Sequence, residues 1–272
     1  MKVAFQGEAG AYSEEAGQGY FDSAEMVPCE SFDAVFEKVA SGECQSGLIP
    51  IENSLAGSIH QNYDLLLRHQ LHIIGEYYLR VRHCLISFPD VDLAGITEVM
   101  SHPQALGQCD RFLRELGVKT NPVYDTAGSV KILKGSGDRN IAAIASKRAA
   151  EIYEMQILEA GIEDNPENYT RFIEIAPQII APEGDVKTSI VVSLKNIPGA
   201  LFKALSVFAL RDIDLTKIES RPLAGKPWEY LFYIDFLGVV NEEVVQRALN
   251  HLDEYAIMLR VLGSYTHFSL DI

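Results

Sequence analysis

Cysteine is scarce in this chain, and its spacing excludes two common roles. The four cysteines among the 272 residues are Cys29, Cys44, Cys84 and Cys109. No two of them have the spacing of a zinc or redox motif, and a disulfide framework requires a much higher cysteine density. We therefore expect free thiols and a reducing compartment.

Positive charge is also in short supply. Lys and Arg total 23 against 38 Asp and Glu, which gives a formal net charge of -15. A surface of this sign disfavours nucleic acid and anionic membranes as partners. A site for an acidic ligand would have to be locally positive, built from a few arginines and from helix N-termini.

Long apolar runs are missing as well. No segment is long enough to span a bilayer, and Met1–Gly7 reads directly as a strand without an apolar leader. Hydrophobic residues still make up 47% of the chain, which is enough for a real core. We expect a folded cytoplasmic protein of one or two domains.

Three kinds of site lack their signatures. The histidines at positions 60, 69, 72 and 83 do not have metal-ligand spacing, and no G-x-S-x-G hydrolase motif occurs. The Gly-rich stretch Gly7–Ser13 lacks nucleotide-loop spacing, and Glu8 would repel a phosphate. We therefore expect neither a metal nor a cofactor.

Strands and helices alternate over the first two thirds of the chain. Strands are expected at 2–6, 25–29, 47–51, 98–101, 119–124, 140–144 and 168–175, with extended structure over 71–88. Helices are expected from about residue 13 and at 32–39, 58–69, 103–116, 127–134 and 147–153. This order predicts an α/β catalytic domain over 1–178. Its two lobes would be about 1–78 with 160–178 and about 79–159, around a cleft.

A second domain is expected after a Pro- and Gly-rich linker at 179–185. Over 186–272, strands are expected at 188–194, 215–221, 228–236 and 256–265, and helices at 199–210 and 242–252. The order βαββαβ is typical of the ferredoxin-like fold, with helices on one face of an antiparallel sheet.

Small polar residues follow several of the expected strands. They occur at Glu52–Ser58, at Ser101–Gln108, at Asp125–Ser129 and at Ala145-Ser146, and Asn168–Phe172 adds polar residues at the start of the returning strand. Strand ends on one sheet edge form the binding crevice of α/β proteins. Each group alone fits an ordinary helix cap or turn, and together they favour one shared cleft.

These segments together resemble the prephenate dehydratase family. The matching motifs are Gly7-x-x-Gly10-x-Tyr12-Ser13, Pro50-Ile-Glu-Asn-Ser54 with Gly57-Ser58, His102-Pro-Gln104 with Gln108-Cys109, Asp125-Thr-Ala-Gly-Ser129 and Tyr169-Thr-Arg-Phe172. The region after the linker resembles the ACT regulatory domain through Pro198-Gly-Ala-Leu201 and Glu219-Ser-Arg-Pro222. Since no chorismate mutase domain is seen ahead of these motifs, we expect the family's monofunctional form.

The resemblance implies a cofactor-free reaction in which prephenate loses its ring hydroxyl and ring carboxylate to give phenylpyruvate, CO2 and water. It implies Thr170 as the group that hydrogen-bonds or protonates the leaving hydroxyl. Glu52 is the second candidate acid, and Arg171 is expected to orient a carboxylate or brace the lobes. The expected substrate-binding residues are Ser13, Asn53, Ser54, Ser58, His102, Gln104, Gln108, Thr126, Ser129 and Phe172. His102 is expected to position Gln104 or Gln108.

The same resemblance implies feedback inhibition by L-phenylalanine at a subunit interface of a homodimer or homotetramer. The expected ligand site is Asn196, Pro198, Gly199, Ala200 and Leu201, with Glu219, Ser220 and Arg221 near the same interface. Two alternatives stay open. Arogenate dehydratase is the alternative enzyme, and a two-lobed small-molecule sensor without catalysis is the alternative from another class.

Overall fold

The computed structural model describes residues 1–223, 225–226 and 228–268. The chain divides into two compact units. Unit 1 comprises Met1–Leu65 and Tyr77–Phe172, and unit 2 comprises Leu66–Glu76 together with the chain from Ile173 onward.

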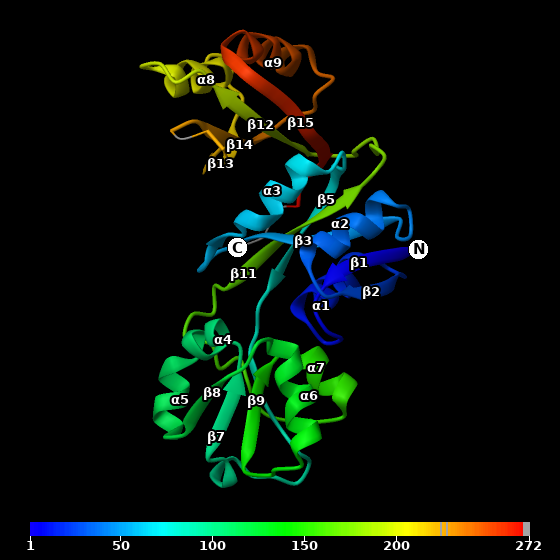
Figure 1. Cartoon of the computed structure of the whole chain (residues 1–272), viewed down its shortest axis with the longest axis vertical. Helices are drawn as coiled ribbons and strands as arrows, with labels where there is room; N and C mark the ends of the chain where they lie inside the picture. The colour runs from blue at the N-terminus through cyan, green and yellow to red at the C-terminus, as the bar shows by residue number, and fades with distance from the viewer. Residues whose placement is uncertain (224, 227, 269–272) are drawn as a thin grey trace. The chain divides into compact units, whose positions relative to one another are not determined.

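The first sheet has the strand order β2-β1-β3-β11-β5, and the short strand β4 pairs with β3 (Figure 1). Its strands are β1 (Lys2–Gln6), β2 (Glu25–Cys29), β3 (Ser46–Asn53), β4 (Gly57–Ser58), β5 (His72–Arg80) and β11 (Tyr169–Ala176). The helices between them are α1 (Tyr12–Tyr20), α2 (Phe32–Ala40) and α3 (His60–Arg68). Because β1 pairs in parallel with both β2 and β3, the ends of these strands deliver their following loops to one edge.

The second sheet has the order β10-β6-β9-β7-β8. Its strands are β6 (Cys84–Ser87), β7 (Glu98–Ser101), β8 (Lys119–Pro122), β9 (Ile141–Ala145) and β10 (Gln156–Ala160). Its helices are η1 (Leu93–Gly95), α4 (Pro103–Gln108), α5 (Asp110–Leu116), α6 (Thr126–Ser136) and α7 (Lys147–Tyr153). The sheet is mixed, since β7 pairs in parallel with β8 and β9 whereas β6 runs antiparallel to β9.

Strand β9 shows how the second sheet builds two cores. Ala142 and Ile144 belong to one buried cluster, and Ala143 and Ala145 belong to another. Successive side chains of a strand point to opposite faces, so both faces of β9 are covered. The continuous apolar run of this strand is typical of a strand buried on both sides.

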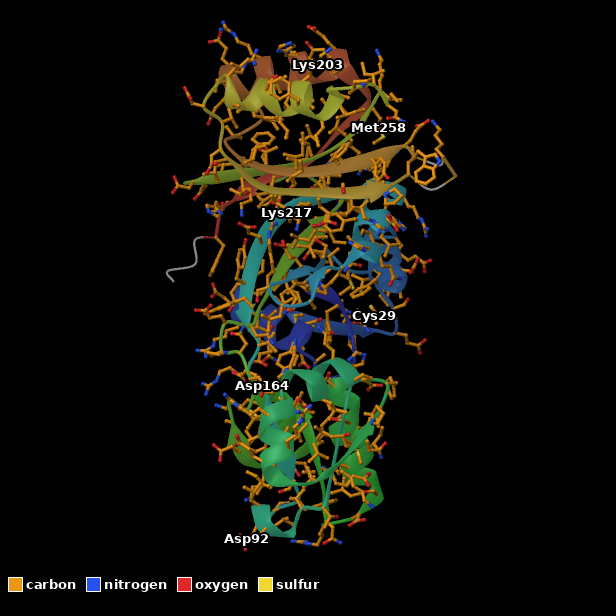
Figure 2. All side chains as sticks on the ribbon, turned by 90° about the vertical axis from the view of Figure 1, so that its left-hand side faces the viewer. Cys29, Asp92, Asp164, Lys203, Lys217 and Met258 are labelled. Atoms are coloured by element: carbon orange, nitrogen blue, oxygen red, sulfur yellow. The ribbon has the colours of Figure 1, made fainter. Side chains whose placement is uncertain are left out.

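The third sheet lies in unit 2 and has the antiparallel order β13-β14-β12-β15. Its elements are β12 (Val186–Leu194), α8 (Ala200–Ala209), β13 (Leu215–Pro222), β14 (Tyr230–Leu237), α9 (Glu243–Tyr255) and β15 (Ala256–Thr266). Both helices cover one face of the sheet; Lys203 lies on this helical layer and Lys217 on the sheet (Figure 2). The predicted ferredoxin-like arrangement is confirmed.

Buried polar contacts hold the segment Leu66–Glu76 within unit 2. Lys187 Nζ donates to both carboxylate oxygens of Glu76 at 2.7 and 3.0 Å, and the two side chains are 2% and 0% exposed. Arg260 donates to the carbonyl oxygens of Leu66 at 3.1 Å and Leu71 at 3.1 Å. A guanidinium suits this position because the last carbonyls of a helix have no partners within the helix.

The predicted element order is confirmed apart from local differences, one of which is the short helix η1 that was not expected. The helix expected at 58–69 begins only at His60, and Ser58 lies in β4 instead of capping it. The helix expected at 103–116 is interrupted at Cys109. Strand β10 was not predicted, since its pattern in Gln156–Ala160 alternates weakly. Within the described residues, no helix combines the length and apolarity required to cross a membrane.

Candidate active site

A cavity of about 310 Å³ lies in unit 1 and is lined from both of its sheets. Nine of the thirteen residues predicted for catalysis or substrate binding line it. They are Ser13, Asn53, Ser58, His102, Gln104, Gln108, Thr126, Thr170 and Phe172. The polar strand ends of the sequence are therefore brought together in one place.

Thr170 contributes a buried hydroxyl to this cavity. It is the second residue of β11 and is 9% exposed. Its Oγ1 accepts a hydrogen bond from Asn53 Nδ2 at 3.0 Å. The same amide nitrogen lies 2.8 Å from Asn168 Oδ1 and 3.1 Å from the Tyr169 carbonyl oxygen. Asn53 thus fixes the start of β11 and leaves Thr170 Oγ1 in the role of an acceptor.

Ser54 holds the same strand from outside the cavity. Its Oγ donates to the Glu167 carbonyl oxygen at 2.8 Å and accepts from the Tyr169 amide at 3.0 Å. Its own amide donates to the Tyr169 carbonyl oxygen at 2.8 Å. These contacts position β11, and Ser54, which was expected to bind substrate, does not line the cavity.

Three further predicted residues also lie outside the lining, and alternation explains two of them. Arg171 stands between Thr170 and Phe172, which both line the cavity, and successive strand side chains point to opposite faces. Glu52 precedes Asn53 on β3 in the same way. Ser129 is fully buried, and its Oγ donates to the Thr126 carbonyl oxygen at 2.6 Å within α6.

The cavity contains little formal charge. Among the described residues that line it, no Lys or Arg occurs, and Asp125 is the only acidic residue. Asp125 caps α6, with its Oδ2 accepting from the Gly128 amide at 2.6 Å. The starts of the nine-residue helix α1 and the eleven-residue helix α6 reach the lining through Ser13 and Thr126. Helix N-termini thus supply positive potential, whereas the arginines expected in the cavity are not there.

Tyr12 and His83 were not predicted as site residues. Tyr12 Oη lies 2.8 Å from His83 Nδ1, and His83 Nε2 lies 2.8 Å from Gln108 Oε1. Burial lowers the pKa of His83, although the hydrogen bond to Gln108 and the charge of Glu163 oppose this effect. Burial also raises the pKa of Tyr12 well above its usual value. Both groups are therefore neutral near pH 7.

His102 was expected to position Gln104 or Gln108, and it contacts the backbone of Gln104. His102 Nδ1 accepts from the Gln104 amide at 3.2 Å and so caps α4. It is His83 that contacts the Gln108 side chain. His83 is separated in sequence by 25 residues from Gln108 and by 71 residues from Tyr12, so no local sequence pattern indicates these contacts.

A second cavity, of about 250 Å³, lies in unit 2 at the start of α8. Four predicted ligand residues line it, namely Asn196, Gly199, Ala200 and Leu201. Pro198, Glu219, Ser220 and Arg221 do not, and Trp228, Glu229 and Tyr230 are lining residues that were not predicted. Within the described part of the chain, no group of three or more His, Cys, Asp or Glu is arranged to hold a metal.

Comparison with known proteins agrees with this geometry. The prephenate dehydratase family model matches residues 3–179, and the ACT domain model matches residues 188–254. "Arogenate dehydratase/prephenate dehydratase 2, chloroplastic" of Arabidopsis thaliana is 50% identical over 97% of this chain and 72% of the relative.

Two solved structures match most of the chain. The prephenate dehydratase of Arthrobacter aurescens in complex with L-Phe has a TM-score of 0.90 and 32% identity, covering 98% of this chain and 90% of that one. GqqA, described as a novel type of quorum quenching acylase, has a TM-score of 0.92 and 32% identity, with 97% of both chains covered.

The two-lobed α/β fold, the polar cavity and the ferredoxin-like domain define a lyase of the dehydratase type with a regulatory domain. The chain belongs to the prephenate dehydratase family. The predicted activity is confirmed at this level, and relatives named for arogenate keep the alternative substrate open.

Proposed function

We propose that residues 1–178 convert prephenate to phenylpyruvate in the cavity of unit 1, with Thr170 as the proton donor to the leaving hydroxyl. The bond to the ring carboxylate breaks and its electron pair enters the ring, while the C–O bond breaks and the hydroxyl leaves as water with the Thr170 proton. The Thr170 oxygen then regains a proton from solvent. The observation that carries the proposal is the hydrogen bond from Asn53 Nδ2 to Thr170 Oγ1 at 3.0 Å. Since the oxygen already accepts this bond, the proton of the hydroxyl is available to a ligand in the cavity. A donated hydrogen bond also stabilises the oxygen as that proton moves away.

Binding of the two prephenate carboxylates is assigned to amides and helix N-termini. Gln108 and Ser13 line the cavity, as does Thr126 at the start of α6. Side-chain amides and the N–H groups of a first helical turn are effective donors to carboxylates without being cations. Phe172 supplies an apolar contact for the ring.

Incubation of the purified chain with prephenate tests the proposal, with phenylpyruvate measured by its ultraviolet absorbance in alkali. We expect enzyme-dependent, saturable product formation without added metal or cofactor. Binding of prephenate without turnover would instead support the sensor alternative.

Arogenate dehydratase is the second candidate, and Asp125 favours it. Arogenate carries an ammonium where prephenate has a ketone, and Asp125 is the acidic residue among the described lining. A carboxylate favours a cation within a few ångströms. The kinetics of both substrates, measured side by side with phenylpyruvate and phenylalanine as the respective products, decide between the two.

The cavity of unit 2 is proposed as an inhibitory site for L-phenylalanine in residues 186–272, which follow the linker at 179–185. The start of α8 at Ala200 suits the carboxylate of the amino acid, and Glu229 suits its ammonium. Glu219, Ser220 and Arg221 are assigned to a subunit interface beside this site, in a homodimer or homotetramer. Analytical ultracentrifugation with and without L-phenylalanine measures the assembly, and a monomer under both conditions would contradict it.

A reducing compartment such as the cytoplasm is proposed for the chain. Its four cysteines are free and buried, and burial raises the pKa of the Cys84 thiol to about 11. Thiols of this kind remain protonated and unreactive.

A further inference from the structure

A chain of side-chain hydrogen bonds runs from the loop after β3 to His83, and its donors and acceptors can be assigned in order. The starting point is Asn53 Oδ1, which accepts from the amides of Leu55 at 3.1 Å and Ala56 at 2.9 Å. A backbone N–H can only donate. The carboxamide of Asn53 therefore has a single allowed orientation, with its nitrogen toward Asn168 and Thr170.

The assignment then passes through two further amides. The atom of Asn168 that faces Asn53 Nδ2 at 2.8 Å must be the acceptor Oδ1. Asn168 Nδ2 consequently faces Gln108 at 3.2 Å, and the atom of Gln108 at that position must be the acceptor Oε1. Asn168 is fully buried, and both contacts join it to protein side chains.

The series of hydrogen bonds ends at His83 and determines its tautomer. The same Gln108 Oε1 lies 2.8 Å from His83 Nε2, so Nε2 must carry the proton. His83 is 2% exposed, and burial lowers its pKa, so the neutral ring has one N–H. Nδ1 is then an acceptor. The single proton of the Tyr12 hydroxyl is shared between Nδ1 at 2.8 Å and the Arg82 carbonyl oxygen at 3.0 Å.

We propose that His83 is a positioning residue of the active site, whose Nε2–H holds the Gln108 carboxamide so that its NH2 group faces the substrate. With Oε1 held by His83 and Asn168, the NH2 of Gln108 has no protein partner among the described residues, and Gln108 lines the cavity. The uncharged Gln108 side chain thereby presents two N–H donors to an anionic ligand.

The location of His83 strengthens this role. It lies between β5 and β6, the strands at which the chain passes from the first sheet to the second. One ring nitrogen contacts Tyr12 of α1, and the other contacts Gln108 of α4. The ring therefore joins one element from each lobe next to the cavity, within unit 1.

This inference rests on the proposed function, and substitutions that separate the two ring nitrogens test it. A glutamine side chain reaches the position of Nε2 and can donate to Gln108, whereas an asparagine reaches only that of Nδ1. We expect His83→Asn and His83→Leu to lower kcat/KM for the preferred substrate about tenfold, the effect of losing one neutral hydrogen bond. His83→Gln should recover most of that loss. Equal losses in His83→Gln and His83→Asn, with unchanged thermal unfolding, would overturn the proposal.

A double-mutant cycle distinguishes positioning from general structural support. If His83 acts through Gln108, then His83→Leu should cost nothing further in a Gln108→Ala background. Losses that multiply in the double variant would show that His83 acts by another route.

The tautomer has a readout that does not require turnover. Imidazole ¹⁵N chemical shifts distinguish a protonated from an unprotonated ring nitrogen, and His83→Gln identifies the signals of this residue. We expect protonated Nε2 and unprotonated Nδ1 at pH 7.5. The reverse tautomer would overturn the proposal even in an active enzyme. A lack of turnover with both prephenate and arogenate would refute the proposed function and leave the tautomer result standing.

Discussion

Replacement of Thr170 by Val is the sharpest test of the proposed chemistry, because the structure separates its catalytic effect from its structural effect. Both side chains are β-branched and of similar size, so the buried volume around β11 is kept. The substitution removes the oxygen that accepts from Asn53 Nδ2 at 3.0 Å. Asn53 Nδ2 retains two other acceptors, Asn168 Oδ1 at 2.8 Å and the Tyr169 carbonyl oxygen at 3.1 Å.

The expected structural cost is therefore small. Loss of one neutral hydrogen bond typically lowers the free energy of unfolding by about 0.5–1.5 kcal/mol, and the remaining acceptors place Thr170→Val at the lower end. Loss of a positioned proton donor typically lowers kcat by about 10²–10⁴, which raises the activation free energy by about 3–5 kcal/mol. The catalytic effect should thus exceed the structural effect severalfold.

Thr170→Ser is the matched control, because it keeps the hydroxyl and loses only a methyl group. Steady-state kinetics with prephenate and chemical denaturation should be measured on both variants and the unmodified chain. We expect Thr170→Ser to keep most of kcat and Thr170→Val to lose at least a hundredfold. A decrease of less than tenfold in folded Thr170→Val would show that another group protonates the leaving hydroxyl.

Three further changes test the other parts of the molecule. Gly199 has φ +78°, so Gly199→Val should distort the start of α8 and abolish inhibition by L-phenylalanine. Gly117→Val, at φ +71° in unit 1, is the control for backbone strain. This control variant should remain inhibited by L-phenylalanine. Asp125→Asn retains the oxygen that caps α6. The ratio of kcat/KM for prephenate to kcat/KM for arogenate should rise severalfold, since one charge contact is worth roughly 1 kcal/mol. An unchanged ratio would show that Asp125 does not select between the two substrates. Glu76→Gln should lower the free energy of unfolding by about 3–5 kcal/mol, because it removes the carboxylate that the buried Lys187 ammonium contacts at 2.7 and 3.0 Å. Adding Lys187→Met should restore most of this loss, and denaturation curves that show additive losses would contradict this account.

The fold was predictable because local signals agreed with the global arrangement. Strand β1 and helix α7 occur at the predicted residues, and the Ser31 cap marks the start of α2 through its hydrogen bond from the Ala34 amide. Each of these signals spans only a few residues. Strand β10 was missed because it pairs antiparallel with β6 across a register shift, and its pattern is set by that distant partner.

The site was predictable to the level of strand ends but not of individual faces. Consecutive residues such as Glu52 and Asn53, or Thr170 and Arg171, were assigned to one site. A strand presents only every second side chain to a given face, and that period was available in the sequence. The role of His83 was not available, because it depends on partners that only the folded chain brings within hydrogen-bonding distance.

The absence of Lys and Arg from the described lining of the cavity bears on the proposed mechanism. In the proposed reaction one carboxylate departs as CO2, so its negative charge flows into the ring while the hydroxyl leaves. A cation beside that carboxylate would stabilise the charge most strongly in the ground state, and the barrier would rise. Neutral donors such as the Gln108 amide and the helix N-termini can hold the substrate in place with less of this effect. Desolvation of the departing carboxylate then favours its loss. The charge needed in the transition state is at the leaving oxygen, where Thr170 offers its proton and Asn53 supports the oxygen left behind.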